Sequence, residues 1–310
     1  MLNQLRLVFP PMTNQIADWL WSDAAAREFV KHSKLYMIGQ RHELLFENVE
    51  VGQTHQTVRF DLVCGAKAAR NVIFPFNQFL ELRTTEFDFD ASPRHMRFSV
   101  ERDGKQLIRW YWPDSFLYAW WRGQITLQNP PNIRDFTSYD LHYVGISKEG
   151  DSFSRLFQNG HENRARILSN ASPIAEKARV TDEILLFLFE VQELGFKSWT
   201  FGEYAETLGR SATPDPTQTQ IVADAEKAFV KILRTEYNRE TYSNYPAGKD
   251  GLAGANLDRY SYIIDEPITF DTLHDSIRGG HFLDNSDPAN MIAIEGEKVE
   301  LMRFTPPPAS

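Results

Sequence analysis

The chain has 310 residues, of which 42% are hydrophobic and 24% charged, and this globular composition excludes the disordered, collagen-like and membrane classes. A formal net charge of -9 excludes a chain-wide basic surface, so any contact with nucleic acid must use a local basic cluster. The single Cys64 excludes an intrachain disulfide and a multi-cysteine zinc site, and the longest apolar run, residues 184–189, is too short to span a bilayer. We therefore expect a cytoplasmic protein without membrane association.

Residues 1–125 predict an N-terminal, mainly antiparallel β domain with a short leading helix. Residues 13–33 carry apolar side chains near helical spacing, and residues 34–127 contain a series of short strand-like runs. In residues 95–112 the alternation flanks Asp103-Gly104, a dipeptide that suits a tight hairpin turn. Four tryptophans of this region fit a core or, alternatively, a base-stacking or ligand surface: Trp110, Trp112, Trp120 and Trp121.

The paired prolines at positions 130 and 131 mark a change of pattern, and the whole chain predicts an α+β protein. We place a core, a small antiparallel sheet flanked by helices, at residues 126–247. Residues 248–310 then supply C-terminal strands and a tail that pack on this core. The segments expected to be regular are helices at 151–158, 161–170 and 217–237, and strands at 184–191, 261–270 and 291–304.

The helix predicted at residues 217–237 carries a carboxylate on its apolar side. Glu226 shares a stripe with Val230, Leu233 and Tyr237, because these residues follow it by 4, 7 and 11 positions. A carboxylate on a packed surface needs a partner, so Glu226 is a candidate functional residue. The alternative is a glutamate near the surface that is favoured by the helix dipole.

Residues 140–147 predict a strand that leads into a glycine turn, and an arginine follows on the next helical turn. Together with the glutamate helix, these segments resemble the GIY-YIG nuclease superfamily. The match lies in Tyr143-Val144-Gly145, Arg155-Leu156, Glu226 and Asn238, over roughly residues 124–246. The gap between Glu226 and Asn238, 238 minus 226 or 12, is similar to the spacing common in that superfamily.

The resemblance implies a GIY-YIG-like endonuclease, a phosphodiester hydrolase that uses Mg²⁺ or Mn²⁺, with nucleic acid as its substrate and DNA favoured over RNA. Glu226 would hold the metal ion, which keeps most of its waters and polarises the phosphate. Arg155 would donate a fixed fork of hydrogen bonds to a phosphate oxygen. Tyr143 would orient or deprotonate the attacking water, and Asn238 would hold the loop or a substrate oxygen.

The chain departs from the superfamily pattern in its first strand, which normally precedes the second by some ten residues and carries its own tyrosine. No such tripeptide precedes Tyr143, and the nearest strand-like candidate is Gly123-Gln124-Ile125. His161 is a second candidate base, although it follows Arg155 by 161 minus 155, or 6, positions, and a surface or capping role is the alternative. The identity of the base is therefore open at this stage.

Two further clusters of polar residues need an interpretation. Lys148, Arg164 and Arg166 are the basic residues near the signature, and we expect them to bind a nucleic-acid backbone unless they form a solvated helix face. The irregular spacing of a second group predicts a polar loop in preference to a metal site, and its members are His274, His281 and Asp284.

Three functions are consistent with these patterns. The first is a metal-dependent nuclease, of a kind that suits defence against foreign DNA, whose N-terminal domain selects the substrate or binds a protein partner or regulatory ligand. The second is an inactive GIY-YIG-like module that binds nucleic acid or a nucleotide. The third is a partner-binding protein that uses its aromatic β domain. The nuclease hypothesis requires Tyr143, Arg155, Glu226 and Asn238 to converge, and it fails if Glu226 lies far from Arg155.

Overall fold

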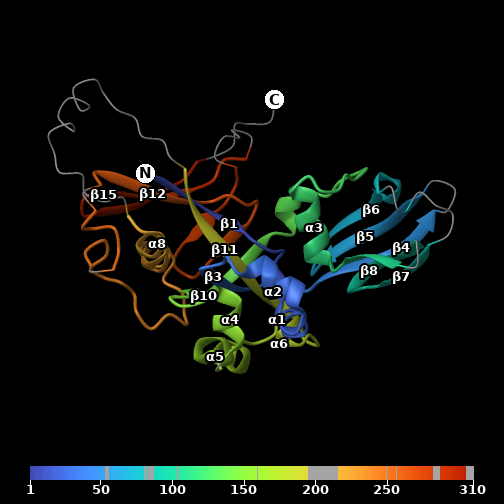
Figure 1. Ribbon diagram of the computed structural model, residues 1–310, viewed down its shortest axis with the longest axis horizontal. Coiled ribbons are helices and arrows are strands. Elements are labelled where there is room, and N and C mark those ends of the chain that lie inside the picture. Colours follow the sequence, from blue (N-terminus) through green and yellow to red (C-terminus); the bar gives the residue numbers. More distant parts are fainter. Residues whose placement is uncertain are drawn as a thin grey trace, which may run out of the picture.

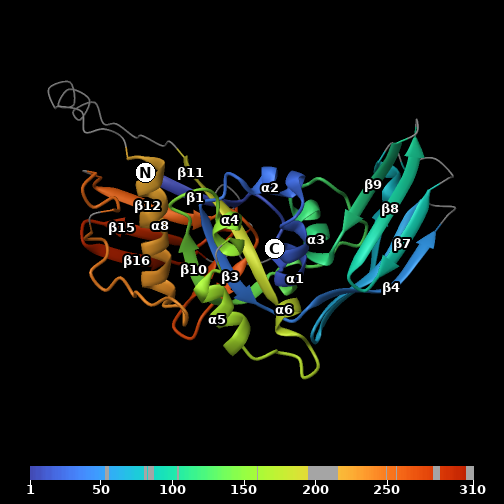
Figure 2. The same ribbon diagram turned by 60° about the horizontal axis from the view of Figure 1, so that its bottom comes forward.

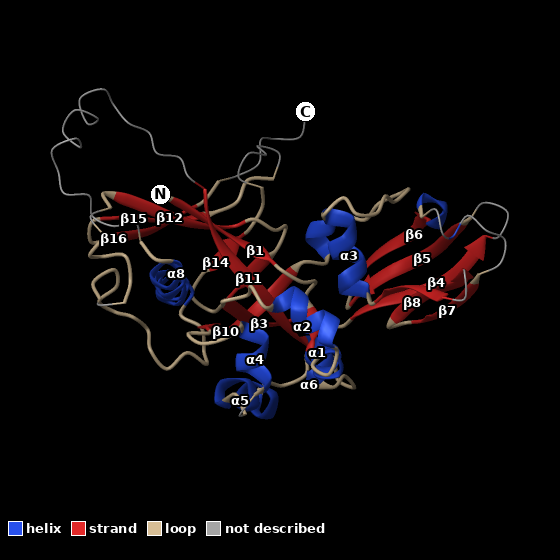
Figure 3. Ribbon diagram, viewed as in Figure 1, coloured by secondary structure: helices blue, strands red, loops and turns tan. Residues whose placement is uncertain are grey.

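The computed structural model describes residues 1–52, 56–79, 82, 87–102, 105–158, 160–194, 216–248, 250–255, 257–281 and 287–304. It has a mixed α/β architecture, with one large sheet and two small antiparallel sheets (Figure 1, Figure 3). None of the described helices is long and apolar enough to cross a membrane.

The large sheet has 10 strands in the order β14-β13-β10-β3-β11-β1-β12-β15-β16, and the short β2 pairs with β11. Arg278 in β14 exchanges hydrogen bonds with Asn290, which directly precedes β15, so the sheet is nearly closed into a barrel. Its strands are β1 (Leu2–Leu7), β2 (Met12–Thr13), β3 (Leu35–Gln40), β10 (Ser138–Ile146), β11 (Ile184–Leu194), β12 (Arg259–Ile264), β13 (Thr269–Asp271), β14 (Ser276–Arg278), β15 (Met291–Glu295) and β16 (Lys298–Met302).

The central strands β3 and β11 are buried on both faces, which explains why their sequences are nearly continuous apolar runs. Leu35 and Met37 of β3 pack in the cluster that α8 covers, whereas Tyr36 and Ile38 pack on the opposite face. In Figure 2, α8 lies across β12, β15 and β16. The helices around the sheet are α1 (Asn14–Leu20), α2 (Ala24–Val30), α4 (Ser152–Phe157), α5 (Glu162–Asn170), α6 (Val180–Glu183) and α8 (Gln218–Leu233).

Residues 41–137 leave the large sheet after β3 and return to it at β10, and we call this segment the inserted module. It contains two three-stranded antiparallel sheets and has a phenylalanine-rich core of its own, which includes Phe46, Phe60 and Phe116. Figure 1 shows it as a separate lobe. Its elements are β4 (Leu44–Gly52), β5 (Thr57–Cys64), β6 (Lys67–Pro75), the 3-10 helix η2 (Phe76–Gln78), β7 (Asp88–Ser92), β8 (His95–Arg102), β9 (Lys105–Tyr111), α3 (Pro113–Trp121) and the 3-10 helix η4 (Ile133–Asp135).

Arg41 lies where the chain leaves the large sheet after β3, and it contacts the segment by which the chain returns to the sheet at β10. Its guanidinium group forms a 2.6 Å ion pair with Asp114 of α3, donates to the carbonyl of Phe136 and lies 4.9 Å from the centre of the Tyr139 ring. Both charged side chains are buried. The entry and exit of the inserted module are therefore held by one side chain.

Most of the locally predicted elements lie where the sequence places them. The helices around Asn14–Val30, Ser152–Asn170 and Gln218–Leu233 are present, and β8 pairs with β9 so that Arg102 lies opposite Lys105. The turn residues 103 and 104 lie outside the described residues. Trp112 is buried and the other three tryptophans are half-buried against the cores, two of them on α3, a helix that the sequence analysis did not predict.

The structure divides the chain differently from the expected boundaries at residues 125 and 247. Strands β1 and β3, which belong to the expected N-terminal domain, pair with β11 in the large sheet. The separate antiparallel β unit begins at residue 41 instead of residue 1, and the C-terminal strand β12 pairs in parallel with β1. Local patterns could not indicate this division because strand pairing here joins segments more than a hundred residues apart.

Candidate active site

Two tyrosines lie side by side on adjacent strands, Tyr36 on β3 and Tyr143 on β10. Gly145 lies opposite Tyr36 in the antiparallel register, and the two tyrosine ring centres are 5.9 Å apart. Tyr139 and Leu141 of β10 pack in the α8 cluster, so alternation alone would point residue 143 toward the same face. The register shifts by one residue between Leu141 and Tyr143, and this β-bulge turns the Tyr143 side chain to the face that carries Tyr36.

Gly145 leaves the space that the two rings occupy. A Cβ atom at this position would lie 2.5 Å from the Tyr143 ring and 2.7 Å from the Tyr36 ring, far inside van der Waals contact. The glycine of the Tyr-Val-Gly triplet is thus required by the packing of the phenols, and its φ angle is not the reason.

The hydroxyl of Tyr36 is hydrogen-bonded to His161, and the Tyr143 ring packs beside both. His161 caps α5, where its Nδ1 accepts from the backbone N–H of Arg164 at 3.0 Å, so the neutral ring carries its proton on Nε2. Nε2 lies 2.6 Å from the Tyr36 hydroxyl and donates to it. The ring centre of Tyr143 lies 5.9 Å from that of Tyr36 and 5.7 Å from that of His161.

Burial keeps both phenols protonated. It raises the pKa of Tyr36 far above its usual range. It also raises the pKa of Tyr143, although the neighbouring Asn163 side chain acts in the opposite direction. Tyr143 therefore faces the cavity as a neutral hydroxyl, and His161, whose two ring nitrogens are engaged by Arg164 N–H and the Tyr36 hydroxyl, supports Tyr36 instead of acting as a base.

Glu226 reaches the same region from α8. The predicted stripe is present in part, because Val230 and Leu233 of α8 are buried and Glu226 is half-buried at its edge. Tyr237 does not continue the stripe, since α8 ends at Leu233 and Tyr237 packs in the cluster on the other face of the sheet. Burial raises the pKa of the Glu226 carboxyl to about 7, against the opposing effect of the Lys148 and Lys227 charges. The helix begins with a capping box formed by Thr217 and Gln220, which fixes where the stripe starts.

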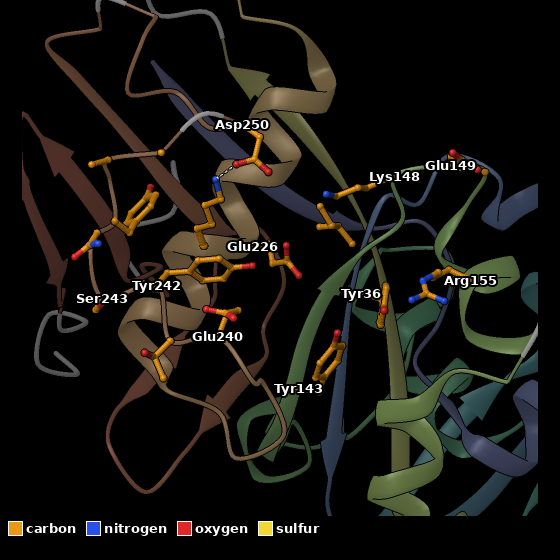
Figure 4. Close-up of a pocket in the computed structure, with 18 of the residues that line it drawn as sticks. Tyr36, Tyr143, Lys148, Glu149, Arg155, Glu226, Glu240, Tyr242, Ser243 and Asp250 are labelled. Atoms are coloured by element: carbon orange, nitrogen blue, oxygen red, sulfur yellow. Dashed lines mark hydrogen bonds and ion pairs between the residues drawn. The ribbon is translucent and has the colours of Figure 1, made fainter.

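These side chains line one cavity of about 1050 Å³. Figure 4 shows Tyr36, Tyr143 and Arg155 on one side of it and Glu226 with Tyr242 on the other. Arg155 and Lys148 come from α4 and from the turn after β10, and both are exposed to the cavity. The charged groups in the lining are Lys148, Glu149, Arg155, Glu226, Lys227, Glu240 and Asp250.

Asn238 supports the site without lining the cavity. Its side-chain carbonyl accepts from the N–H of Val144 at 3.0 Å, and its amide donates to the carbonyl of Val144 at 2.8 Å. The backbone N–H of Tyr237 donates to the carbonyl of His142. The segment after α8 is thereby bound to the part of β10 that carries Tyr143, as expected for a residue that holds a loop.

Arg164 and Arg166 of α5, which the sequence predicts to bind a nucleic-acid backbone, contact other groups of the protein. Arg164 donates to Asn14 and lies 4.0 Å from the centre of the Phe157 ring, and Arg166 donates to Asn163. Neither lines the cavity, so only Lys148 of the three predicted backbone-binding residues faces it. The guanidinium groups instead fix α5 against neighbouring protein groups.

Comparisons of the chain with protein-family models, with curated proteins and with solved structures give no match. The resemblance to the GIY-YIG superfamily thus rests on the residues and their arrangement alone.

The donor set of the cavity fits one kind of metal site. In the described part of the chain, no three His, Cys, Asp or Glu side chains are grouped so that they could hold a metal ion, and His281 pairs with Asp265 while Asp284 lies outside that part. A closed zinc site is therefore not formed by these residues. Mg²⁺ and Mn²⁺ keep several waters and need few carboxylates, and Glu226 in a roomy cavity meets that requirement.

Sequence reasoning missed Tyr36 and Tyr242, which both line the cavity. The superfamily pattern predicts a first tyrosine strand shortly before Tyr143, but the nearest candidate, Gly123-Gln124-Ile125, is not a strand, because Gly123 lies in the turn after α3 with a φ of 68°. The partner strand of β10 is β3, on the far side of the inserted module. The available signal was the apolar run around Tyr36, which the sequence analysis assigned to a strand without assigning it a partner.

Proposed function

We propose that the protein is a metal-dependent nuclease that hydrolyses phosphodiester bonds of nucleic acid. One observation carries the proposal: two phenols, an arginine and a carboxylate, from β3, β10, α4 and α8, face one cavity. These are the group types that the chemistry requires, namely a hydroxyl that orients the attacking water, a donor to a phosphate oxygen and a ligand for a cation. DNA remains the expected substrate.

Each side chain has a distinct task in this proposal. Tyr143 orients the attacking water through its hydroxyl, and the proton of that water passes to solvent in the open cavity. Arg155 donates to a non-bridging phosphate oxygen, and Lys148 neutralises a neighbouring phosphate. Glu226 holds Mg²⁺ or Mn²⁺, which when bound polarises the phosphate and stabilises the leaving oxygen.

The test is cleavage of DNA and RNA substrates with Mg²⁺ or Mn²⁺. We expect Glu226→Ala and Arg155→Ala each to lower the cleavage rate by about 10²-fold or more, and Tyr143→Phe by a similar factor. Arg259→Ala and Glu295→Ala are matched controls, because these side chains form an exposed ion pair on the large sheet, and they should cleave like the wild type. Binding of nucleic acid without cleavage by the wild type would support the non-catalytic binding module instead.

A further inference from the structure

The charged side chains of the cavity do not form a basic groove. The lining has three cationic and four anionic side chains, a balance of 3 minus 4, or -1. Lys227 already forms an ion pair with Asp250. Within the described ranges, Lys148 and Arg155 are then the cationic lining groups without an ion-pair partner, and both are exposed.

Three cations next to the cavity are engaged by other protein groups. Lys34 and Lys231 donate to backbone carbonyls of the loops that line the cavity, and Arg239 forms an ion pair with Glu162. These three charges are therefore already hydrogen-bonded or paired. They leave the two unpaired cations of the lining as the expected phosphate contacts.

Exposed carboxylates lie on both sides of the cavity. Figure 4 shows Glu149 on the side of Lys148, and it shows Asp250 and Glu240 on either side of Glu226 at the opposite wall. Duplex DNA carries one negative charge per about 1.7 Å of its axis, so a duplex laid across the cavity would place several phosphates against these carboxylates. The charges of the lining therefore disfavour a duplex.

The size of the cavity and its aromatic lining suit a few unpaired nucleotides. Its volume of about 1050 Å³ is close to the upper end of the range for small-ligand pockets, about 300–1,000 Å³. Tyr242 lines it from the loop after α8, half-buried and with a φ of 48°, a left-handed conformation that large residues rarely adopt. A tyrosine kept there at a conformational cost offers a ring for an unpaired base, whereas the bases of a duplex are already stacked on one another.

We propose that the cavity takes an end or a short stretch of single-stranded nucleic acid and excludes the duplex. This choice of substrate class rests on the proposed function. One phosphate lies at Arg155, a neighbouring phosphate lies at Lys148, and an unpaired base stacks on Tyr242.

The test is binding of a labelled single-stranded oligodeoxynucleotide of about four nucleotides, compared with a duplex, by fluorescence anisotropy without a metal ion. Two phosphate contacts at about -0.7 each predict a slope of about -1.4 for the logarithm of the association constant against the logarithm of the salt concentration. Lys148→Gln and Arg155→Gln should each reduce this slope to about -0.7. Lys67→Gln is the matched control, because Lys67 is exposed on β6 and lies outside the cavity lining.

Two further variants test the stacking ring and the acidic side chains separately. Tyr242→Ala should weaken binding of the oligonucleotide by about tenfold or more and leave the salt slope unchanged, since the ring carries no charge. Glu149→Gln combined with Glu240→Gln removes two exposed charges beside the cavity, and we expect it to strengthen duplex binding about three- to tenfold.

Several results would overturn the assignment of a single strand. They are tighter binding of the duplex than of the oligonucleotide by the wild type, a salt slope that requires many phosphate contacts, and no binding of the oligonucleotide at all. If the oligonucleotide binds as expected and no nucleic acid is cleaved with Mn²⁺, the nuclease proposal fails while the single-strand preference stands. If a duplex is cleaved faster than a single strand, the nuclease proposal stands and the single-strand preference fails.

Discussion

At the scale of the residue, His161 shows how one side chain can serve both a helix and a site. Its Nδ1 satisfies an otherwise unpaired N–H at the start of α5, and this contact fixes the tautomer that donates to Tyr36. Burial, followed by the positive charges of Arg155 and Arg164, lowers the pKa of His161 to about 4. The imidazole is therefore neutral in the folded protein at neutral pH.

This depressed pKa predicts a pH-dependent stability. Between its ordinary pKa of about 6.5 and pH 4, the unfolded chain binds a proton at His161 and the folded chain does not, so the free energy of unfolding falls as the pH falls, by at most about 3 kcal/mol. His161→Asn keeps a capping acceptor and removes the titration. Urea unfolding at pH 7 and pH 4.5 should show a smaller loss for His161→Asn than for the wild type, and equal losses would contradict the assignment.

At the scale of the element, the bulge in β10 and the segment after α8 act together. The bulge turns Tyr143 toward Tyr36, and Asn238 binds both backbone groups of the next residue, Val144. A bulge interrupts the regular ladder on one side of a strand, so side-chain amides can replace the missing backbone partners. The direction of Tyr143 thus depends on a contact from an element about ninety residues downstream.

Asn238→Asp tests that contact with almost no change of shape. The carboxylate still accepts from Val144 N–H, but it cannot donate to the Val144 carbonyl and repels it, so we expect the free energy of unfolding to fall by about 1–3 kcal/mol. Cleavage should fall as well, because Tyr143 loses its support. Asn132→Asp is the matched control, since Asn132 is an exposed cap that only accepts a hydrogen bond. Unchanged chemical denaturation of Asn238→Asp would argue against the support role.

At the scale of the whole molecule, the inserted module separates β3 and β10, the strands that carry Tyr36 and Tyr143, in the sequence. Contacts at the point where the module joins the large sheet hold the two strands together in space. β3 ends at Gln40 and β10 begins at Ser138, and Arg41 contacts both crossings. A second connection lies at the far end of α3, where Glu266 accepts from Trp121, Arg122 and the N–H of Leu7. The module is thus tied to the large sheet at two buried polar contacts.

The buried ion pair of Arg41 and Asp114 predicts that removing one partner destabilises the protein more than replacing both. Arg41→Met leaves Asp114 as an unpaired buried charge, and we expect it to lower the free energy of unfolding by about 3–5 kcal/mol. The double variant Arg41→Met with Asp114→Leu replaces the whole pair by apolar groups and should recover a large part of that loss. Thermal unfolding followed by circular dichroism measures both, and a double variant as unstable as Arg41→Met would contradict this account.

The sequence by itself determined the local elements and half of the site. Helical spacing put Glu226 at the edge of a packed stripe, the apolar run at residues 184–191 predicted the buried strand that is β11, and Asp103-Gly104 predicted a hairpin. Each signal depends only on residues within a few turns or one strand. The resemblance of the Tyr-Val-Gly triplet and the following Arg-Leu pair to the GIY-YIG superfamily pointed to Tyr143 and Arg155.

Only the tertiary structure decided which residues lie beside Tyr143, Arg155 and Glu226. Tyr36 reaches Tyr143 because β3 pairs with β10 across the inserted module, and no local propensity specifies a pairing over that separation. The one-residue bulge reverses the face of Tyr143 without a signal in the alternation, and Tyr242 adopts a backbone conformation that its residue type disfavours. Long-range pairing and packing override local preference at these positions, and it is there that the cavity is formed.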